Sequence, residues 1–427
     1  MSRPRLILAP GKEKALLRRH PWIFSGALLA SPLRHGSPLR PANGTSSSGA
    51  RREDLCVASP SDGDLVDVFS SDGRWLAVGH YQNDTIICKV LSFDTPVIDD
   101  AFFFSRIRSA IAYRQRLGFF DSLKHSSIQA LKQSTNVFRL INGEGDNLPG
   151  LICDWYAGTL VMQAHSVGMH HLFPSLVGHF VELLKPYGLL SIYDKSSATL
   201  PGGCENSFLW GEQLEEREVC ENGNRMMINF VEGQKTGFFV DQRDNRQLVG
   251  SLSSGCRVLN CFGYTGGFSL AALRGGAAYV ETVDISKRAI ELCNRNVELN
   301  FGPDASHRGV VADVLKYLDA PVDPFDVIIL DPPAFAKNHR SLQQGLKGYR
   351  SINQRAMERI APGGLLFTFS CSQAVSPDDF QTMIFTSAAN AHRFVRIVRH
   401  LPHAADHPVS IYHPEGLYLK GLLLQVE

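Results

Sequence analysis

The feature that most constrains the fold is a series of short apolar segments separated by helical ones, which begins near residue 226. Five β-prone runs follow one another there: RVLNCF (257–262), YVETVD (279–284), GVVAD (309–313), FDVIILD (325–331) and LLFTFS (365–370). Such nearly continuous apolar runs are typical of strands buried on both faces. Amphipathic segments lie between them, such as SKRAIELCNRNVELN, which Ser286 is expected to cap. The pattern predicts an α/β fold with a mostly parallel sheet covered by helices.

The end of the chain breaks this alternation. The apolar runs RFVRIVRH (393–400) and LYLKGLLLQV (417–426) are joined by a loop with no helical pattern. Strands without a crossover helix pair antiparallel. We therefore expect a terminal antiparallel hairpin on the sheet edge of a Rossmann-like domain that spans residues 213–427.

Two smaller domains are expected before this one. Residues 1–95 contain β-prone runs, two of which flank the turn signal SDG (71–73) and predict a hairpin. A stretch at 31–54 is rich in Ser, Pro, Gly and Arg without a hydrophobic period, which is typical of a disordered insertion. Residues 97–212 combine a basic amphipathic helix at 101–118 with several strands, and predict a middle α+β domain.

Charge and composition limit the class of protein. The net charge is only +1, but residues 1–54 hold ten Lys/Arg against three Asp/Glu, and residues 101–140 hold seven against one. Two basic blocks suit either a polyanionic partner or a solvated basic face. No apolar run reaches the ~18 residues that span a bilayer, and the apolar core of the N-terminus is too short for a signal peptide. We therefore expect a cytoplasmic protein with no membrane partner.

The nine cysteines include no C-x-x-C pair. That spacing is the usual sign of a zinc site, and an odd number of cysteines does not suggest a disulfide framework. We expect free thiols in a reducing compartment, most of them buried as small side chains, and no bound metal.

A ligand pocket is predicted at the carboxyl ends of the parallel strands, where ligands bind in open α/β sheets. The first strand runs into NCFGYTGGFS, where Gly263, Gly266 and Gly267 allow a tight turn and close approach of the backbone to a ligand. The spacing differs from the G-x-G-x-x-G of dinucleotide-binding enzymes, which argues against a nicotinamide oxidoreductase.

Three aspartates stand at the ends of successive strands. Asp284 ends the second strand, Asp313 ends the third, and Asp331 begins DPPAF after the fourth. Each one alone is most simply explained as a helix N-cap. Three carboxylates beside a glycine-rich turn suit a ligand with a ribose, an adenine amino group and a positive centre, and would repel a pyrophosphate. They predict S-adenosylmethionine as the cofactor.

The fifth strand ends at Ser370 and Cys371, which places a thiol on the same rim as the DPP turn. The simplest interpretation is a buried thiol that closes a strand. The functional alternative is a nucleophile that attacks C6 of a pyrimidine, so that C5 becomes electron-rich enough to take a methyl group. Asp331, protonated or sharing a proton with N3 of the base, would steady the charge on the ring. The base would have to leave its stack to reach this site.

Seven segments stand in a characteristic order along the chain: LLRRHPWIFSGAL, GEGDNLPGLICD, QKTGFFVDQRDNR, VLNCFGYTGGFSL, FDVIILDPPAF, GYRSINQRAMERIAPGGLLFTFSCS and PEGLYLKG. Together they resemble the bacterial large-subunit ribosomal RNA methyltransferase I family, whose members are 23S rRNA cytosine-C5 methyltransferases that use S-adenosylmethionine. The resemblance implies a PUA domain, a small RNA-binding fold, for residues 1–95. It also implies the middle domain, a C-terminal methyltransferase domain and ribosomal RNA as the partner.

The resemblance implies site residues as well. The family's nucleophile falls on Cys371, with Asp331 beside it. The implied cofactor contacts are Gly263, Tyr264, Gly266, Asp284, Asp313, Asp331 and Gln242. Gln242 and Arg243 stand in FFVDQRDNR, before the first strand, and are expected to line the pocket. Related RNA cytosine-C5 methyltransferases often carry a second Cys after the DPP-type turn, where this chain has Ala334, so no base for the C5 proton is assigned.

Two other functions stay open. The DPP turn also opens the site of enzymes that methylate a base nitrogen, and these need no thiol. An RNA-binding platform without turnover would keep the same fold, although the intact glycine turn and the three strand-end aspartates argue against it.

Overall fold

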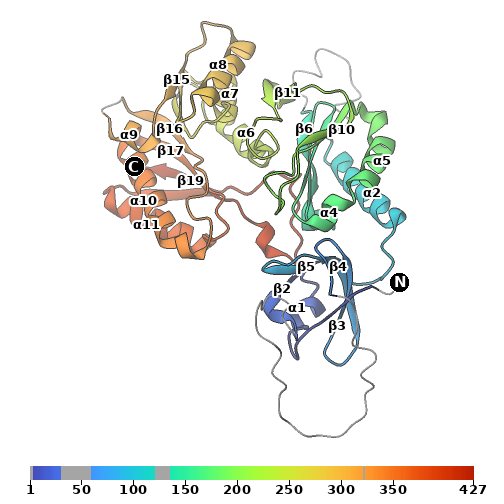
Figure 1. Cartoon of the computed structure of the whole chain (residues 1–427). Coiled ribbons are helices and arrows are strands. Elements are labelled where there is room, and N and C mark those ends of the chain that lie inside the picture. Colours follow the sequence, from blue (N-terminus) through green and yellow to red (C-terminus); the bar gives the residue numbers. More distant parts are fainter. Residues whose placement is uncertain (1–2, 30–58, 121–134, 321–322) are drawn as a thin grey trace, which may run out of the picture. The chain divides into compact units, whose positions relative to one another are not determined.

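The computed structural model describes residues 3–29, 59–120, 135–320 and 323–427, so the expected insertion at 31–54 lies outside the described residues. The chain divides into two compact units (Figure 1). The first unit holds Met1–Arg116, Arg139–Gln213 and Pro408–Pro414, and the second holds Leu117–Phe138, Leu214–His407 and Glu415–Glu427.

A five-stranded sheet forms the N-terminal part of the first unit. Its strands are β1 (Arg5–Ile7), β2 (Trp22–Phe24), β3 (Leu65–Phe69), β4 (Trp75–Tyr81) and β5 (Ile86–Ser92), in the order β1-β3-β4-β5-β2. The short helix α1 (Lys14–Leu17) precedes β2, and the 3-10 turn η1 (Ser25–Ala27) follows it. β3 and β4 pair antiparallel, which confirms the predicted hairpin. Alternate residues of β3 are buried, as expected for a strand with one face on a core.

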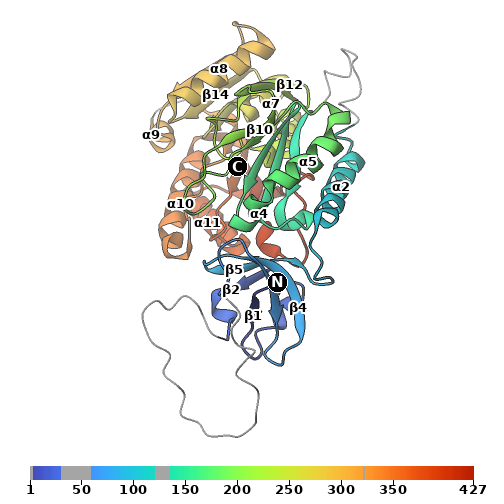
Figure 2. The ribbon, with the colours of Figure 1, turned by 45° about the vertical axis from the view of Figure 1, so that its right-hand side comes forward.

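A second five-stranded sheet belongs to this unit, except for Val137 and Phe138 at the start of one strand, which the division assigns to the second unit. Its strands are β6 (Val137–Asn142), β7 (Leu151–Tyr156), β8 (Thr159–Ala164), β9 (Ser191–Asp194) and β10 (Ser207–Gly211), in the order β10-β9-β8-β7-β6. β8 and β9 are parallel, whereas β7–β8 and β9–β10 are antiparallel. The helices are α2 (Asp100–Arg116), α4 (Val167–His171) and α5 (Phe173–Leu184), with 3-10 turns η3 (Gly143–Asp146) and η4 (Lys185–Tyr187) (Figure 2). α2 confirms the basic helix predicted at 101–118.

The second unit contains the predicted sheet. Its strands are β13 (Arg257–Cys261), β14 (Tyr279–Asp284), β15 (His307–Val311), β16 (Phe325–Leu330), β17 (Ile360–Ser370), β18 (Val395–His400) and β19 (Lys420–Val426), in the order β15-β14-β13-β16-β17-β19-β18. The first five strands pair parallel, whereas β19 pairs antiparallel with both β17 and β18. The fold class is therefore α/β, with the expected terminal antiparallel hairpin.

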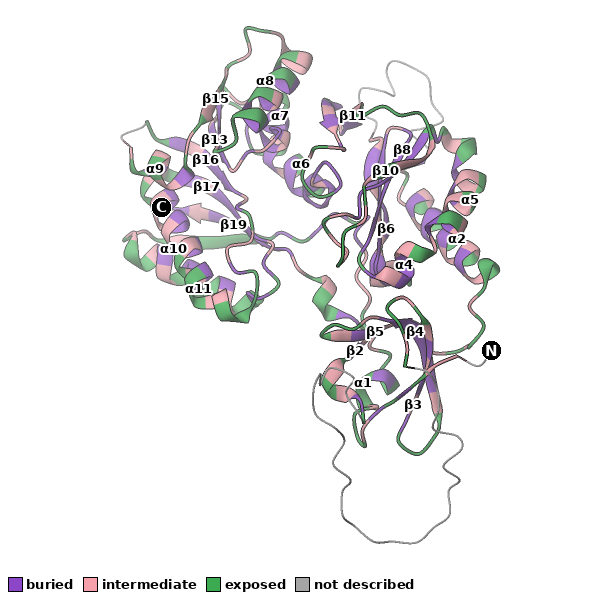
Figure 3. Cartoon of the chain, in the orientation of Figure 1, coloured by how far each residue is buried: buried purple, intermediate pink, exposed green. Residues whose placement is uncertain are grey.

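Helices cover both faces of this sheet. They are α6 (Arg243–Ser251), α7 (Gly267–Arg274), α8 (Lys287–Phe301), α9 (Val314–Asp319), α10 (Leu342–Arg359) and α11 (Pro377–Asn390), with 3-10 turns η5 (Val240–Gln242), η6 (His339–Ser341) and η7 (Pro414–Gly416). Residues of α6 and α7 share one apolar core with the strands, and residues of α9, α10 and α11 share the other. Figure 3 shows β16 and β17 buried between these layers. Ser286 caps α8, as predicted, by accepting a hydrogen bond from the Ala289 N–H.

Two features of the second unit differ from expectation. A separate hairpin of β11 (Glu216–Glu221) and β12 (Asn224–Asn229) precedes the large sheet. Its turn is Asn222-Gly223, and both residues have positive φ, which is the usual chemistry of a tight hairpin turn. The loop between β18 and β19, expected to be free of helix, contains η7. Within the described parts of the chain, no helix is long and apolar enough to cross a bilayer.

Candidate active site

The carboxyl ends of the parallel strands form one edge of the seven-stranded sheet. Asp284 ends β14, Asp331 directly follows β16, and Cys371 directly follows β17. The strand order reverses at β13, which has β14 on one side and β16 on the other. Ligands of open α/β sheets bind at such a reversal. The three side chains thus stand on the edge of the sheet where a ligand is expected.

The glycine turn after β13 follows this edge. Its backbone is bent at Phe262, Tyr264 and Gly266, with φ of 58°, 45° and 85°. A Cβ on Gly263 would overlap the Thr282 methyl group, and one on Gly266 would overlap the sulfur of Cys293. Only glycine fits at these two positions, so the turn can pack against β14 and α8 while α7 begins directly after it.

The Asp284 carboxylate organises this turn. One of its oxygens accepts a hydrogen bond from the Tyr264 N–H at 3.0 Å, and the other accepts one from the Ser286 N–H at 2.8 Å. Each carboxylate oxygen has a further lone pair, so the group can still accept hydrogen bonds from a diol. Ile285, the next residue, is 73% exposed and offers an apolar surface beside the carboxylate. The arrangement suits a nucleoside, with a polar sugar and a flat ring.

Asp313 occupies a different environment. β15 ends at Val311, so Asp313 stands two residues beyond the strand, in an exposed position. Its side chain caps α9 by accepting a hydrogen bond from the Lys316 N–H at 3.0 Å. The capping explains why an acidic residue stands there, and a contact with the cofactor remains a prediction.

Asp331 and Gln242 are brought together although they stand far apart in the domain sequence. Asp331 is half-buried, and the loss of solvent around its carboxyl group, with the negative charge of Asp241, raises its pKa to about 7. A hydrogen bond with the Gln242 side chain acts in the opposite direction. Gln242 is itself buried, and its carbonyl oxygen accepts a hydrogen bond from Asn245 at 2.7 Å. Asp331 can therefore exist as a neutral acid near neutral pH.

Arg243 has a structural role in the described structure. Both ends of its guanidinium group donate to the Asp406 carboxylate at 2.8 Å, and both side chains are at most 5% exposed. The guanidinium also lies over the Phe119 ring, 4.5 Å from its centroid. These contacts account for the buried charge of Arg243, which was expected from the sequence to line the pocket.

The Cys371 thiol lies among charged groups. The side chain is half-buried, and burial raises its pKa. The carboxyl groups of Asp331 and Asp241 raise the pKa further, whereas the ammonium group of Lys235 lowers it. A nucleophilic thiol needs such a cation, because only the thiolate attacks.

Lys420 brings a second ammonium group to this thiol. Its backbone pairs with Ser370 across β17 and β19. Its Nζ donates to the carbonyl oxygen of Ser372 at 2.5 Å and to that of Tyr418 at 2.6 Å. Burial lowers the pKa of Lys420 to about 8, and the negative charge that Cys371 carries as a thiolate opposes this shift. Cys371 therefore lies between Ser370, which pairs with the backbone of Lys420, and Ser372, whose carbonyl oxygen accepts a hydrogen bond from the Lys420 side chain.

Hydrogen bonds also join the end of β17 to the segment after Asp331. The Ser372 hydroxyl donates to the carbonyl oxygen of Ala336. The Tyr349 hydroxyl accepts a hydrogen bond from the Phe335 N–H at 3.4 Å and is also bonded to Ser370. Both contacts fix the strand end that carries the thiol against the DPP segment.

Sequence reasoning assigned no role to Lys235, Asp241, Tyr349 or Lys420. A signal was present for Lys420, because a lysine within the apolar run LYLKGLLLQV interrupts a buried strand and needs a partner. Lys235 stands in an exposed loop at a positive φ of 49°, with its Nζ 4.9 Å from the centre of the Phe239 ring. No periodic pattern marks a loop residue of this kind.

Two family models match the chain. The first, described as S-adenosylmethionine-dependent methyltransferase, matches residues 198–412. The second, described as a PUA-like domain, matches residues 6–93. The first match covers the glycine turn and Asp284, Asp331 and Cys371, so S-adenosylmethionine is the cofactor of this site's family.

Curated relatives match over nearly their whole length. Ribosomal RNA large subunit methyltransferase I of Klebsiella pneumoniae (strain 342) is 36% identical over 435 residues, which cover 99% of this chain and 98% of the relative. The protein of the same name from Escherichia coli (strain SMS-3-5 / SECEC) is 37% identical over 432 residues, with 99% of both chains covered.

Solved structures share the fold. The structure of SMU.776, described as a methyltransferase and complexed with SAH, superimposes with a TM-score of 0.79 at 22% identity and covers 99% of this chain and 100% of that chain. A protein from Streptococcus mutans, described as a SAM-dependent methyltransferase, gives 0.78 at 22% identity with the same coverage. At this identity the likeness concerns the fold alone.

Proposed function

Because the chain belongs to the ribosomal RNA large subunit methyltransferase I family, we propose that it methylates C5 of a cytosine in large-subunit (23S) ribosomal RNA. The observation that carries the proposal is the position of Cys371, which follows β17 on the edge that also holds Asp331 and Asp284. A methyltransferase that modifies a nitrogen has no need of a thiol there, whereas C5 of cytosine is a poor nucleophile until C6 is attacked.

We assign the cofactor contacts to the edge described above. The residues are Gly263, Tyr264, Gly266, Asp284, Asp313, Asp331 and Gln242. Asp284 would accept hydrogen bonds from the ribose hydroxyl groups, and Ile285 would lie against the adenine ring. The bare backbone of Gly263 and Gly266 leaves no side chain between the turn and the ligand. When bound, S-adenosylmethionine supplies an activated methyl group.

In the proposed chemistry Cys371 acts first. Its thiolate forms a bond to C6 of the flipped cytosine, and the electron pair of the C5–C6 double bond moves to C5, which then takes the methyl group. Removal of the C5 proton restores the double bond and expels the Cys371 thiolate. The ammonium groups of Lys235 and Lys420 favour the thiolate in both steps.

Asp331 would act on the same ring. A carboxyl group with a pKa of about 7 holds a proton in a large fraction of molecules at neutral pH. It can therefore donate a hydrogen bond to N3 of the cytosine while negative charge develops on the ring. The neutral acid also avoids repulsion of the Cys371 thiolate.

We infer that residues 1–95 bind RNA as a PUA-like domain, ahead of a middle domain at 97–212 and the methyltransferase domain at 213–427. Lys12, Lys14, Arg18 and Arg19 flank or belong to α1 and are exposed, and Phe24 nearby is 44% exposed. Cations and an exposed aromatic ring suit phosphate groups and unstacked bases.

The direct test is an adduct assay with RNA that contains 5-fluorocytidine. Fluorine at C5 cannot leave as a proton does, so the enzyme should stay bound to C6 through Cys371 after methyl transfer. Peptide mass spectrometry of the full chain should locate the adduct on the peptide that contains Cys371.

Cys256→Ala is the matched control, because Cys256 is also half-buried and precedes β13, at the opposite edge of the same sheet. It should keep the adduct, and Cys371→Ala should lose both adduct and turnover. Turnover by Cys371→Ala would refute the covalent scheme and favour methylation of a base nitrogen.

A further inference from the structure

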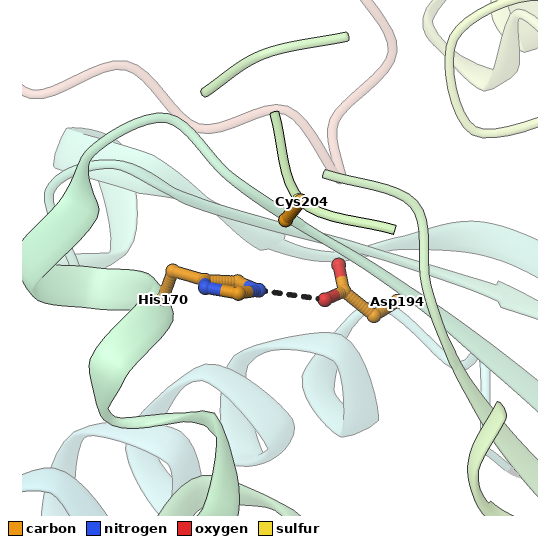
Figure 4. Close-up of side chains that lie close together, drawn as sticks. All are labelled: His170, Asp194 and Cys204. Atoms are coloured by element: carbon orange, nitrogen blue, oxygen red, sulfur yellow. Dashed lines mark hydrogen bonds and ion pairs between the residues drawn. The ribbon is translucent and has the colours of Figure 1, made fainter. Parts of the chain in front are cut away.

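Three potential metal ligands from separate segments of the first unit converge near the parallel pair β8 and β9 (Figure 4). His170 stands on α4, the helix that follows β8, and Asp194 is the last residue of β9. Cys204 belongs to the loop that leads from β9 to β10. One ligand atom from each residue lies within 4.8 Å of the other two.

Local structure fixes each of the three positions. The Ser166 hydroxyl caps α4 by accepting a hydrogen bond from the Met169 N–H, one residue before His170. The loop after β9 is closed by a hydrogen bond of 3.0 Å from the Ser197 N–H to the Asn206 side chain. Gly202 and Gly203, both with positive φ, turn the chain so that Cys204 returns to the end of β9.

The two oxygens of Asp194 have separate partners. Oδ1 accepts hydrogen bonds from the Ser196 N–H at 2.9 Å and from the Ser196 hydroxyl group. Oδ2 lies 2.8 Å from Nε2 of His170. Ser196 therefore orients the carboxylate so that its other oxygen points at the imidazole, and the hydrogen bonds from Ser196 are of the outer kind that orients a metal ligand.

We propose that His170, Asp194 and Cys204 bind one zinc ion. Imidazole, thiolate and carboxylate are the three ligand types that zinc uses, at roughly 2.0–2.3 Å. The ion would replace the proton between His170 and Asp194, and the two ligand atoms, which lie 2.8 Å apart, would separate by about half an ångström to reach tetrahedral positions. Cys204 would release its proton to solvent, and a water molecule would complete the coordination.

The site would tie the loop after β9 to α4. It does not depend on the proposed methyltransferase chemistry, because all three ligands lie in the first unit. Sequence reasoning expected no metal because the cysteines form no C-x-x-C pair. Here the ligands are far apart in the sequence and come together only through the pairing of β8 with β9 and the two glycines.

The test is a titration of the full chain with Co²⁺, which reports thiolate ligation through a sulfur-to-cobalt charge-transfer band. One equivalent should saturate the band, and Zn²⁺ should remove it by competition. Cys204→Ser and His170→Gln should each abolish the band, whereas Cys256→Ser and Cys371→Ser should keep it. Absence of the band in the unaltered chain, or its full retention in Cys204→Ser, would overturn the proposal.

A second measurement avoids variants that fail to fold. The unaltered chain is alkylated with iodoacetamide with and without Zn²⁺, and the peptides that contain Cys204 and Cys256 are quantified by mass spectrometry. Zinc should slow alkylation of Cys204 at least tenfold and leave that of Cys256 unchanged. Equal rates at Cys204 with and without zinc would refute the site.

Discussion

The Nζ atom of Lys420 lies 2.5 Å from the carbonyl oxygen of Ser372, the residue that follows Cys371. The lysine thereby holds the chain just beyond the thiol, while its own backbone pairs with Ser370 just before it. A buried ammonium group at this position both fixes the strand end and favours a thiolate. Its effect on thiol reactivity can be measured without RNA.

Lys420→Met should make Cys371 less reactive. The substitution keeps the length of the apolar stem and removes both the positive charge and the hydrogen bond to Ser372. We expect the pKa of Cys371 to rise, with about tenfold slower alkylation at pH 7 for each pKa unit. The difference should shrink above about pH 8, where Lys420 itself loses its charge. Lys287→Met, at a lysine side chain that is 81% exposed on α8, is the control and should react like the unaltered chain.

Asp331→Asn should stabilise the protein at alkaline pH. In the folded state the pKa of Asp331 is about 7, raised from 3.8, so the stability that its protonated form contributes is fully present below about pH 4, falls as the pH rises from there, and is lost once the pH has passed through 7. Asn cannot ionise and avoids this loss. The variant should therefore gain on the order of 2 kcal/mol relative to the unaltered chain between pH 4 and pH 8, after allowance for partial exposure. Urea unfolding at both pH values measures the gain, and a difference independent of pH would contradict it.

The sheet could be predicted because its signals are local. Long apolar runs separated by capped amphipathic helices leave few alternatives to a parallel sheet, and the absence of a helix pattern between the last two runs indicated the hairpin. The same logic placed Asp331 and Cys371 on one edge, since residues that follow parallel strands share an edge.

The surroundings of the thiol could not be predicted in this way. Lys420 reaches Cys371 only because β19 lies between β17 and β18, and a sequence does not give that order. At Asp313 only the strand boundary differs from expectation: β15 ends two residues earlier, at Val311, and the Asp313 carboxylate caps α9.

Arg243→Met should cost the fold much more than loss of a surface ion pair. The substitution leaves the Asp406 carboxylate buried beside His407 without its bidentate partner, and removal of one member of a buried pair costs about 3–5 kcal/mol. Arg225→Met is the control, because the Arg225–Glu218 pair is exposed and worth at most about 1 kcal/mol. Urea unfolding compares the two variants, and equal losses would show that the buried pair is not needed for stability.

Gly266→Ala should disrupt the cofactor turn for two reasons, which are backbone strain at a positive φ and overlap of the new methyl group with a neighbour. Gly363→Ala separates them, because it carries the strain without the overlap. Both glycines have φ near 80°, at 85° and 81°, so both substitutions carry the same backbone strain of about 1–2 kcal/mol. Gly363 has open space around a new Cβ, whereas at Gly266 the methyl group would overlap the sulfur of Cys293. The excess loss in Gly266→Ala, about 1–3 kcal/mol in urea unfolding, measures the overlap. Calorimetric titration should show at least tenfold weaker binding of S-adenosylmethionine to Gly266→Ala and unchanged binding to Gly363→Ala. Unchanged binding to Gly266→Ala would show that the turn does not take part in cofactor binding.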